Sequence, residues 1–378
     1  MDEFLGAWDK AFRSPSARLF TRYVNFPKVE TGALEECLAT LRHGMSTLEP
    51  LSLPIRECRI LPDTSEIREA VASLEALAAG LGEETPDTLF LRAVALDLVA
   101  EGRGQLGDVP GCIAALREAA QLAARGGLAV ERCFLLLRLV EVLSKSGAKQ
   151  ESISVAREAA PVAAGLDGWK QTYGCYTLCG LSRILTNNGA LEESLDMAAK
   201  AVEIAERIYG TMYNTTAPRL PGALVQLAEA HHLRGELAAA EAALLRARAL
   251  WEQGPPMRLN EQVGACLHKL ASLREESGDM AGSIAYLREA VDFWRRYRDR
   301  VGFSNHPRSC AKLAQALGNL GTALTREREW HEAGAALENA LALSVALGRG
   351  KSPEAREYAD NLDLCRAALL DWEPGRAS

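Results

Sequence analysis

Apolar residues three positions apart recur in pairs along the chain, and a turn residue follows each pair at a constant distance. The members lie eleven and eight residues before that turn: Leu96/Val99, Leu136/Leu139, Leu178/Leu181, Leu224/Leu227, Leu267/Leu270 and Leu317/Leu320. A small side chain follows each turn after five residues, and an alanine follows it after twelve. Apolar i, i+3 spacing on both sides of a turn predicts two amphipathic helices that fold back as a hairpin, and small residues let such helices cross closely.

Six turns of this kind organise the sequence, and five of them are glycines: Gly107, Gly147, Gly189, Gly235, Gly278 and, as the exception, Arg328. Residues 278–290 nearly repeat residues 107–119, which indicates an internal repeat. The turns follow one another after 40, 42, 46, 43 and 50 residues. The pattern predicts first helices over residues 88–104, 130–145, 171–186, 217–233, 261–276 and 309–326, and a second helix after each turn.

The pattern resembles the tetratricopeptide repeat, in which Leu-Gly marks the first helix and alanines seven apart mark the second. The last unit shows it in Leu320-Gly321 and in Ala333, Leu337 and Ala340. The resemblance covers roughly residues 86–347. Because the units are longer than the usual length of about 34 residues, they are most similar to the long-helix variety found in kinesin light chains. The tyrosine typical of the family's first helix is replaced by Arg103, Leu143, Leu185, His231, Arg274 and Leu324.

The resemblance implies an all-α fold, a right-handed α-solenoid of six helical hairpins with helical caps at both ends. We expect residues 86–350 to form the hairpins and residues 351–378 to form a C-terminal capping helix and tail. Residues 1–85 fit the repeat poorly, and we expect an N-terminal helical cap or degenerate repeat there, since a terminal unit must cover its neighbour's apolar face. The alternative is a separate interaction module, whose aromatic residues form a partner surface or a homodimer contact: Phe4, Trp8, Phe12, Phe20, Tyr23 and Phe26.

The composition narrows the classes of function. A net charge of −7 over 378 residues argues against a general nucleic-acid binder. Charged residues interrupt every long apolar run, so we expect no membrane span, and the acidic start Met1-Asp2-Glu3 argues against a secretory signal. These features favour a cytoplasmic protein, in which the nine cysteines are small buried side chains.

Motifs that suggest catalysis or cofactor binding each lack a required residue. Gly350-Lys351-Ser352 ends like a phosphate-binding loop, but Val345 stands where the first glycine of that loop belongs. Cys175 and Cys179 lie one helical turn apart, but no further pair or histidine cluster follows at zinc spacing. We therefore expect a non-catalytic protein without metal or cofactor.

In the tetratricopeptide family the first helices line a concave groove, and its ligand-facing positions lie thirteen, ten, six, three and two residues before the turn. We call these the groove positions. The residues that the resemblance places there, and that we expect to bind a partner, are Asp97, Glu101, Phe134, Leu137, Glu141, Tyr176, Arg183, Val225, Glu229, His232, His268 and Glu275. Apolar and acidic side chains dominate this set, with Arg183 as a basic residue in the middle.

This set favours an adaptor or scaffold that binds, in its groove, a segment of a partner protein with basic and apolar side chains. Complementary charge orients such a partner and speeds its association. Two alternatives remain open. The inner surface is an ordinary solvated face, or the chain is a peptide-responsive regulator in which an N-terminal effector region precedes a tetratricopeptide receptor, a reading that rests on analogy of architecture.

Overall fold

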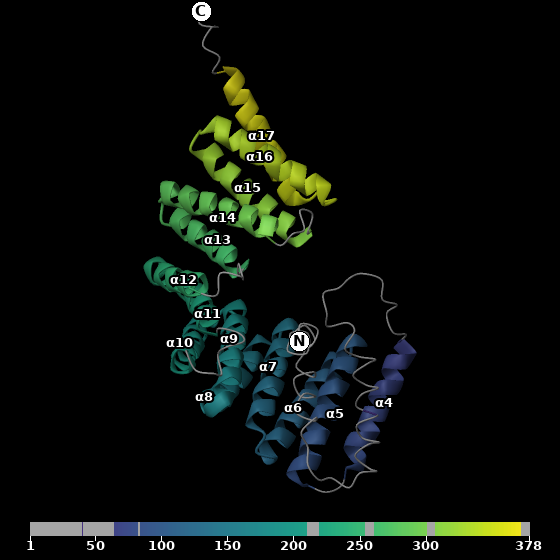
Figure 1. Cartoon of the computed structure of the whole chain (residues 1–378). Coiled ribbons are helices and arrows are strands. Elements are labelled where there is room, and N and C mark those ends of the chain that lie inside the picture. The colour runs from purple at the N-terminus through teal and green to yellow at the C-terminus, as the bar shows by residue number, and fades with distance from the viewer. Residues whose placement is uncertain are drawn as a thin grey trace, which may run out of the picture. The chain divides into compact units, whose positions relative to one another are not determined.

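The computed structural model describes residues 40, 64–81, 84–209, 219–253, 261–300 and 307–371, which form helices and turns and contain no strand. The chain divides into two compact units, here called the N-terminal unit (Met1–Arg219) and the C-terminal unit (Leu220–Ser378). Each unit is a stack of helices that run back and forth (Figure 1). The all-α solenoid class expected from the sequence is confirmed.

Helices pair in the order that the repeat predicts. The N-terminal unit contains α4 (Thr64–Gly80), α5 (Pro86–Gln105), α6 (Val109–Arg125), α7 (Ala129–Lys145), α8 (Lys149–Ala164), the 3-10 turn η3 (Gly168–Lys170), α9 (Gln171–Asn187) and α10 (Leu191–Ile208). The remaining helices are α11 (Arg219–Leu233), α12 (Leu237–Glu252), α13 (Glu261–Glu276), α14 (Met280–Arg300), α15 (Pro307–Arg326), α16 (Trp330–Ala346) and α17 (Pro353–Asp371). The six first helices begin and end within two residues of their predicted bounds.

The six turn residues share one backbone conformation. Their φ angles are 79° at Gly107, 86° at Gly147, 82° at Gly189, 79° at Gly235, 83° at Gly278 and 63° at Arg328. In each turn the next residue donates its N–H to the carbonyl five residues earlier, as Asp279 does to Arg274 at 2.8 Å. This left-handed C-terminal cap is the reason that glycine recurs. Arg328 is the one non-glycine residue with positive φ in the described part of the chain.

Small residues let the two helices of each hairpin approach closely. The alanine twelve residues after each turn is 0% exposed in all six hairpins: Ala119, Ala159, Ala201, Ala247, Ala290 and Ala340. The small residue five positions after the turn is also buried, and Cys112 takes this place in the first hairpin. Ser152 and Ser194 stand there in the next two and donate their hydroxyls to the first-helix carbonyls of Val140 and Ser182, at 2.9 Å in both cases.

Helices outside the hairpins cover the two ends that the structure describes. α4 packs on α5, and Arg103 forms an ion pair with Glu75 at 2.6 Å. α17 packs on α15 and α16 and buries Tyr358 and Leu362 in the core, as expected of a C-terminal cap. The aromatic residues between Phe4 and Phe26 lie outside the described residues.

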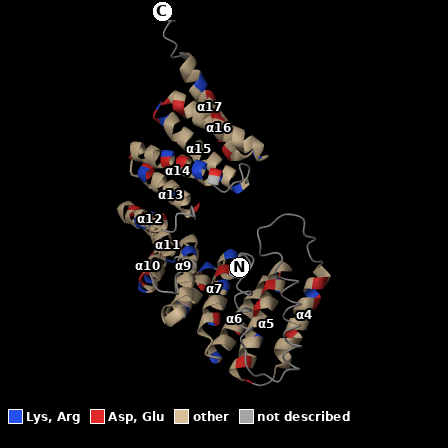
Figure 2. Cartoon of the chain, viewed as in Figure 1, with Lys and Arg blue, Asp and Glu red and all other residues tan. Residues whose placement is uncertain are grey.

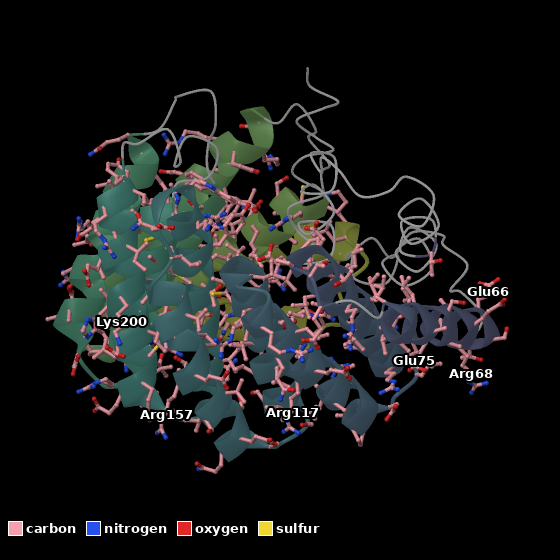
Figure 3. All side chains as sticks on the ribbon, turned by 90° about the horizontal axis from the view of Figure 1, so that it is seen from below. Glu66, Arg68, Glu75, Arg117, Arg157 and Lys200 are labelled. Carbon is pink, nitrogen blue, oxygen red and sulfur yellow. The ribbon has the colours of Figure 1, made fainter. Side chains whose placement is uncertain are left out.

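The second helices are joined by a series of ion pairs in repeat register. An arginine ten residues after one turn binds a glutamate four residues after the next, in the pairs Arg117–Glu151, Arg157–Glu193 and Arg288–Glu332. Figure 3 shows Arg117 and Arg157 on the lower rim of the N-terminal unit, on α6 and α8. We call this series the outer ladder. Exposed pairs of this kind each contribute about 0–1 kcal/mol to stability.

None of the described helices combines the length and the apolar content that crossing a lipid bilayer requires. Acidic and basic residues are interspersed along the helices of both units (Figure 2).

Candidate protein-binding groove

Arg138 on α7 binds two acidic groove residues of the preceding hairpin. Its guanidinium forms ion pairs with Asp97 and, at 2.6 Å, with Glu101, both on α5. Asp97 is only 1% exposed, and burial raises the pKa of its carboxyl while Arg138 opposes the shift. Asp97 therefore links two hairpins. The prediction that its side chain faces a partner is wrong, because the side chain is buried.

Lys269 on α13 repeats this arrangement in the C-terminal unit. Its ammonium forms an ion pair with Glu229 on α11. Arg138 and Lys269 both lie nine residues before their own turn, and each reaches the acid that lies six residues before the preceding turn. Two of the expected acidic groove residues, Glu101 and Glu229, are thus partly neutralised by the protein itself.

Glu141 lacks this kind of partner because the equivalent residue of the next hairpin is Gly180. Its carboxylate pairs with Lys145, four residues along the same helix, at 2.9 Å, and its side chain is 41% exposed. Gly180 instead makes room for Leu137, since a Cβ at that position would lie 2.9 Å from the Leu137 methyls. Arg183, on the helix that carries Gly180, is exposed.

Aromatic side chains meet between α7 and α9. The ring centroids of Phe134 and Tyr176, both thirteen residues before their turns, are 6.0 Å apart. Tyr173 lies edge-on to Phe134 at 5.6 Å and also to Trp169 at 5.6 Å. Phe134 itself is 4% exposed, so Tyr176 and Leu137 form the more accessible part of the expected apolar wall.

On α11, the other expected groove residues also contact neighbouring side chains. His232 binds Glu276 on α13, with 2.7 Å between Nε2 and the carboxylate oxygen. Val225 packs on the core that contains Ala228 and Leu244. Together with the Glu229–Lys269 pair, these contacts join α11 to α13.

A cavity of about 830 Å³ lies in the C-terminal unit, along groove positions of the fifth and sixth hairpins. His268, Ser272 and Glu275 of α13 line one side, and groove positions of α15 line the other: Gln315, Thr322 and Arg326. Arg326 forms an ion pair with Glu275 across it. The structure thus brings together His268 and Glu275 of the expected site.

α17 packs on groove positions of the last hairpin. Tyr358 packs directly on Gly318, where any side chain would overlap its ring. Asn361 donates a hydrogen bond to the Thr322 hydroxyl at 3.1 Å. The last groove segment is therefore occupied by the chain's own helix.

His268 is enclosed on α13. Burial, reinforced by the nearby Lys312 cation, lowers the pKa of His268 to about 4, so the ring is neutral at pH 7. Neither ring nitrogen has a hydrogen-bond partner among the described side chains and backbone. This unsatisfied pair of polar atoms is unusual in a buried position.

Cys175 and Cys179 remain free thiols on α9. A hydrogen bond between them lowers the pKa of Cys175 and raises that of Cys179. Within the described ranges, no group of three or more His, Cys, Asp or Glu side chains is placed to hold a metal ion.

The set of groove residues predicted from the sequence does not include the residues of this protein that contact or lie near the groove positions. These are Arg138, Lys269, Lys312 and Tyr358. Arg138 and Lys269 carry a signal in the sequence, because they occupy the same position of the repeat and an acid stands at a fixed position of the preceding hairpin. Tyr358 carries none, since its place depends on how α17 docks.

Comparison with known proteins agrees with the helical register. A family model described as tetratricopeptide repeat matches residues 175–212. This segment of the chain is therefore similar to a tetratricopeptide repeat. The matched segment contains most of α9 and all of α10, the third hairpin. No curated protein matches the chain.

Two solved structures with low sequence identity and TM-scores above 0.5, RapI and BtubC, share the fold of this chain. The apo form of RapI is 12% identical with a TM-score of 0.53, covering 95% of this chain and 92% of RapI. BtubC (BKLC) from P. vanneervenii is 15% identical with a TM-score of 0.51, covering 65% of this chain and 92% of BtubC. A putative kinesin light chain repeat protein from Podosopora anserina is 18% identical with a TM-score of 0.46, covering 58% of this chain and 97% of the other.

Proposed function

We propose that the protein is a non-catalytic adaptor whose first helices bind a segment of a partner protein. The observation that carries this proposal is the contact between groove residues of successive hairpins, Phe134 of α7 with Tyr176 of α9. Contact between equivalent positions makes a continuous surface along neighbouring first helices, which suits an extended or helical segment.

The side chains that remain accessible define the chemistry of the partner. Leu137 and Tyr176 are half-buried and offer apolar contact, while Glu141 is 41% exposed and Arg183 is exposed. Arg183 has no ion-pair partner among the described residues. We expect a segment with apolar side chains between a basic residue at Glu141 and an acidic residue at Arg183. We expect a basic residue of the partner only at Glu141, because the other acids of the expected site pair with residues on neighbouring helices, whereas Glu141 pairs with the exposed Lys145 of its own helix.

Affinity capture with a single charge reversal tests the proposal. Arg183→Glu changes an exposed groove residue without breaking an ion pair that the structure shows. Lys149→Glu is the matched control, because Lys149 is exposed at the start of a second helix. Partners that wild type and Lys149→Glu retain, and Arg183→Glu loses, are groove partners. Equal recovery with all three proteins would contradict the groove proposal.

The alternative function is a peptide-responsive regulator. Its support is the similarity of fold to RapI, which extends over 95% of this chain. Small-angle scattering separates the two functions once a partner-derived peptide is in hand. A regulator compacts or changes its oligomeric state when the peptide binds, whereas an adaptor keeps its dimensions.

A further inference from the structure

The cavity between α13 and α15 contains buried polar groups that the fold leaves unsatisfied. Ser283 lines it and is 0% exposed, and its hydroxyl has no hydrogen-bond partner in the described structure. The equivalent serines of two other hairpins, Ser152 and Ser194, both donate to a first-helix carbonyl. His268 adds two more polar atoms without partners to the same cavity. Buried polar groups are normally hydrogen-bonded, so these atoms are available to bind a polar ligand.

Lys312 supplies a positive charge at this place. Its ammonium donates to the side-chain oxygen of Gln315 at 3.2 Å and has no carboxylate partner among the described residues. The other basic side chains of α15 that line the cavity are both neutralised, Arg308 by Glu261 at 2.8 Å and Arg326 by Glu275. Arg349, Glu354 and Glu357 also line the cavity, and Lys312 is the one cation of α15 there without a carboxylate partner in the described structure.

The walls limit the size of the occupant. The volume of about 830 Å³ lies within the range of small-molecule sites. α17 closes the groove beyond it, because Tyr358 lies against Gly318 and Asn361 binds Thr322. A long segment cannot continue through this end, whereas a compact ligand or a single side chain fits.

We propose that this cavity is an oxyanion-binding site, in which Lys312 supplies the charge and His268 and Ser283 supply hydrogen bonds to a phosphoryl or carboxylate group. Charge-assisted hydrogen bonds to a Lys ammonium are strong ones. The site goes beyond partner binding at α7 and α9, since it needs no partner segment to be occupied. The anion comes from a free small molecule or from an acidic side chain of a bound segment.

Two probes distinguish these sources. Inorganic phosphate represents the free anion, and blocked glutamate amide represents an acidic side chain. We expect one or both to bind to the full chain at constant ionic strength, to shift the imidazole NMR signals of His268, and to raise the pKa of that ring. Lys312→Gln weakens the binding about tenfold or more. Lys149→Gln, at an exposed position of the N-terminal unit, leaves it unchanged.

Assignment of the His268 signals uses His268→Gln, and circular dichroism verifies that each variant is folded. Phosphate binding that depends on Lys312 identifies a free oxyanion as the ligand, and glutamate binding that depends on Lys312 identifies an acidic side chain. The proposal is overturned if neither probe moves the His268 signals, or if Lys312→Gln binds as tightly as wild type. Because Arg183→Glu tests a different unit, failure here leaves the adaptor proposal standing.

Discussion

Arg138 on α7 and Asp97 on α5 form an ion pair between successive hairpins in which the aspartate side chain is 2% exposed. The guanidinium also binds Glu101 at 2.6 Å, so one cation holds two carboxylates. Removing one partner of a buried pair leaves an uncompensated charge, which costs more than the pair itself contributes. The first two hairpins therefore depend on Arg138.

Arg138→Met should lower the free energy of unfolding by about 3 kcal/mol at pH 7. Burial already raises the pKa of Asp97, and loss of the cation raises it further. An acid whose folded-state pKa is raised costs no stability below its unfolded-state pKa of about 3.9. The cost grows as the pH rises from that value to the folded-state pKa, and it is complete above it. The deficit should therefore shrink toward pH 4, as urea unfolding followed by circular dichroism at both pH values will show.

Two further variants control this experiment. Arg183→Met removes an exposed arginine and should change stability by less than about 0.5 kcal/mol. Asp97→Asn in the Arg138→Met background removes the buried charge and should restore part of the loss. An equal deficit at pH 4 and pH 7 would contradict the electrostatic explanation.

Arg328 occupies a turn that glycine fills in the other five hairpins, with φ of 63°. A residue with a Cβ is strained there by about 1 kcal/mol, and the Arg328 side chain is exposed. Arg328→Gly should raise the free energy of unfolding by about 0.5–1 kcal/mol despite its greater freedom in the unfolded state. Gly278→Ala, the reverse change in an equivalent turn, should lower it by a similar amount. Thermal and urea denaturation measure both, and a destabilising Arg328→Gly would refute this account.

The turn at Arg328 also shows how much of the fold the sequence predicts. The apolar and small residues around Arg328 follow the repeat pattern closely. The register of the last hairpin and the bounds of α15 are therefore predicted correctly although the glycine is absent. The groove is less predictable because its side chains bind one another. Glu229 is an acid at a groove position in the sequence, but Lys269 reaches it only once α13 packs on α11. Tyr358 lies far along the chain from Gly318, and their contact follows from the docking of α17.

Gly318→Ala tests that docking. An alanine Cβ would overlap the Tyr358 ring, so the variant should lower stability by about 1–3 kcal/mol. Hydrogen exchange in α17 should accelerate more than exchange in α13. Gly334→Ala on α16 is the matched control, because a Cβ there meets its nearest atom at 3.9 Å. It should be neutral or stabilising by up to about 1 kcal/mol. Unchanged exchange in α17 of Gly318→Ala would show that the contact is dispensable.

His268 should make stability depend on pH in the acidic range. Its folded-state pKa is about 4, below the ordinary value of about 6.5. A base with a lowered pKa gives stability that is present above the unfolded value and lost as pH falls toward the folded one. The full effect is about 3 kcal/mol between pH 6.5 and pH 4. The charged and titratable side chains that line the same cavity are Lys312, Arg308, Arg326, Arg349, Glu275, Glu354, Glu357 and Tyr358.

Urea unfolding of wild type and of His268→Gln between pH 6.5 and pH 4 measures the contribution of His268 to stability. Glutamine does not titrate, so the stability of the variant relative to wild type should rise as pH falls. His331→Gln, at an exposed position of α16, should follow wild type at every pH. Parallel curves for wild type and His268→Gln would show that the imidazole is not enclosed in solution.

One hairpin contributes to the outer ladder on both of its sides. The hairpin of α7 and α8 carries Glu151, which binds Arg117 of the hairpin before it, and Arg157, which binds Glu193 of the one after. If this hairpin were duplicated in tandem, Arg157 of the first copy would lie opposite Glu151 of the second copy. The two copies would then form the same kind of ion pair. Recombination that duplicates or removes this hairpin would therefore keep an arginine opposite a glutamate at the new junction.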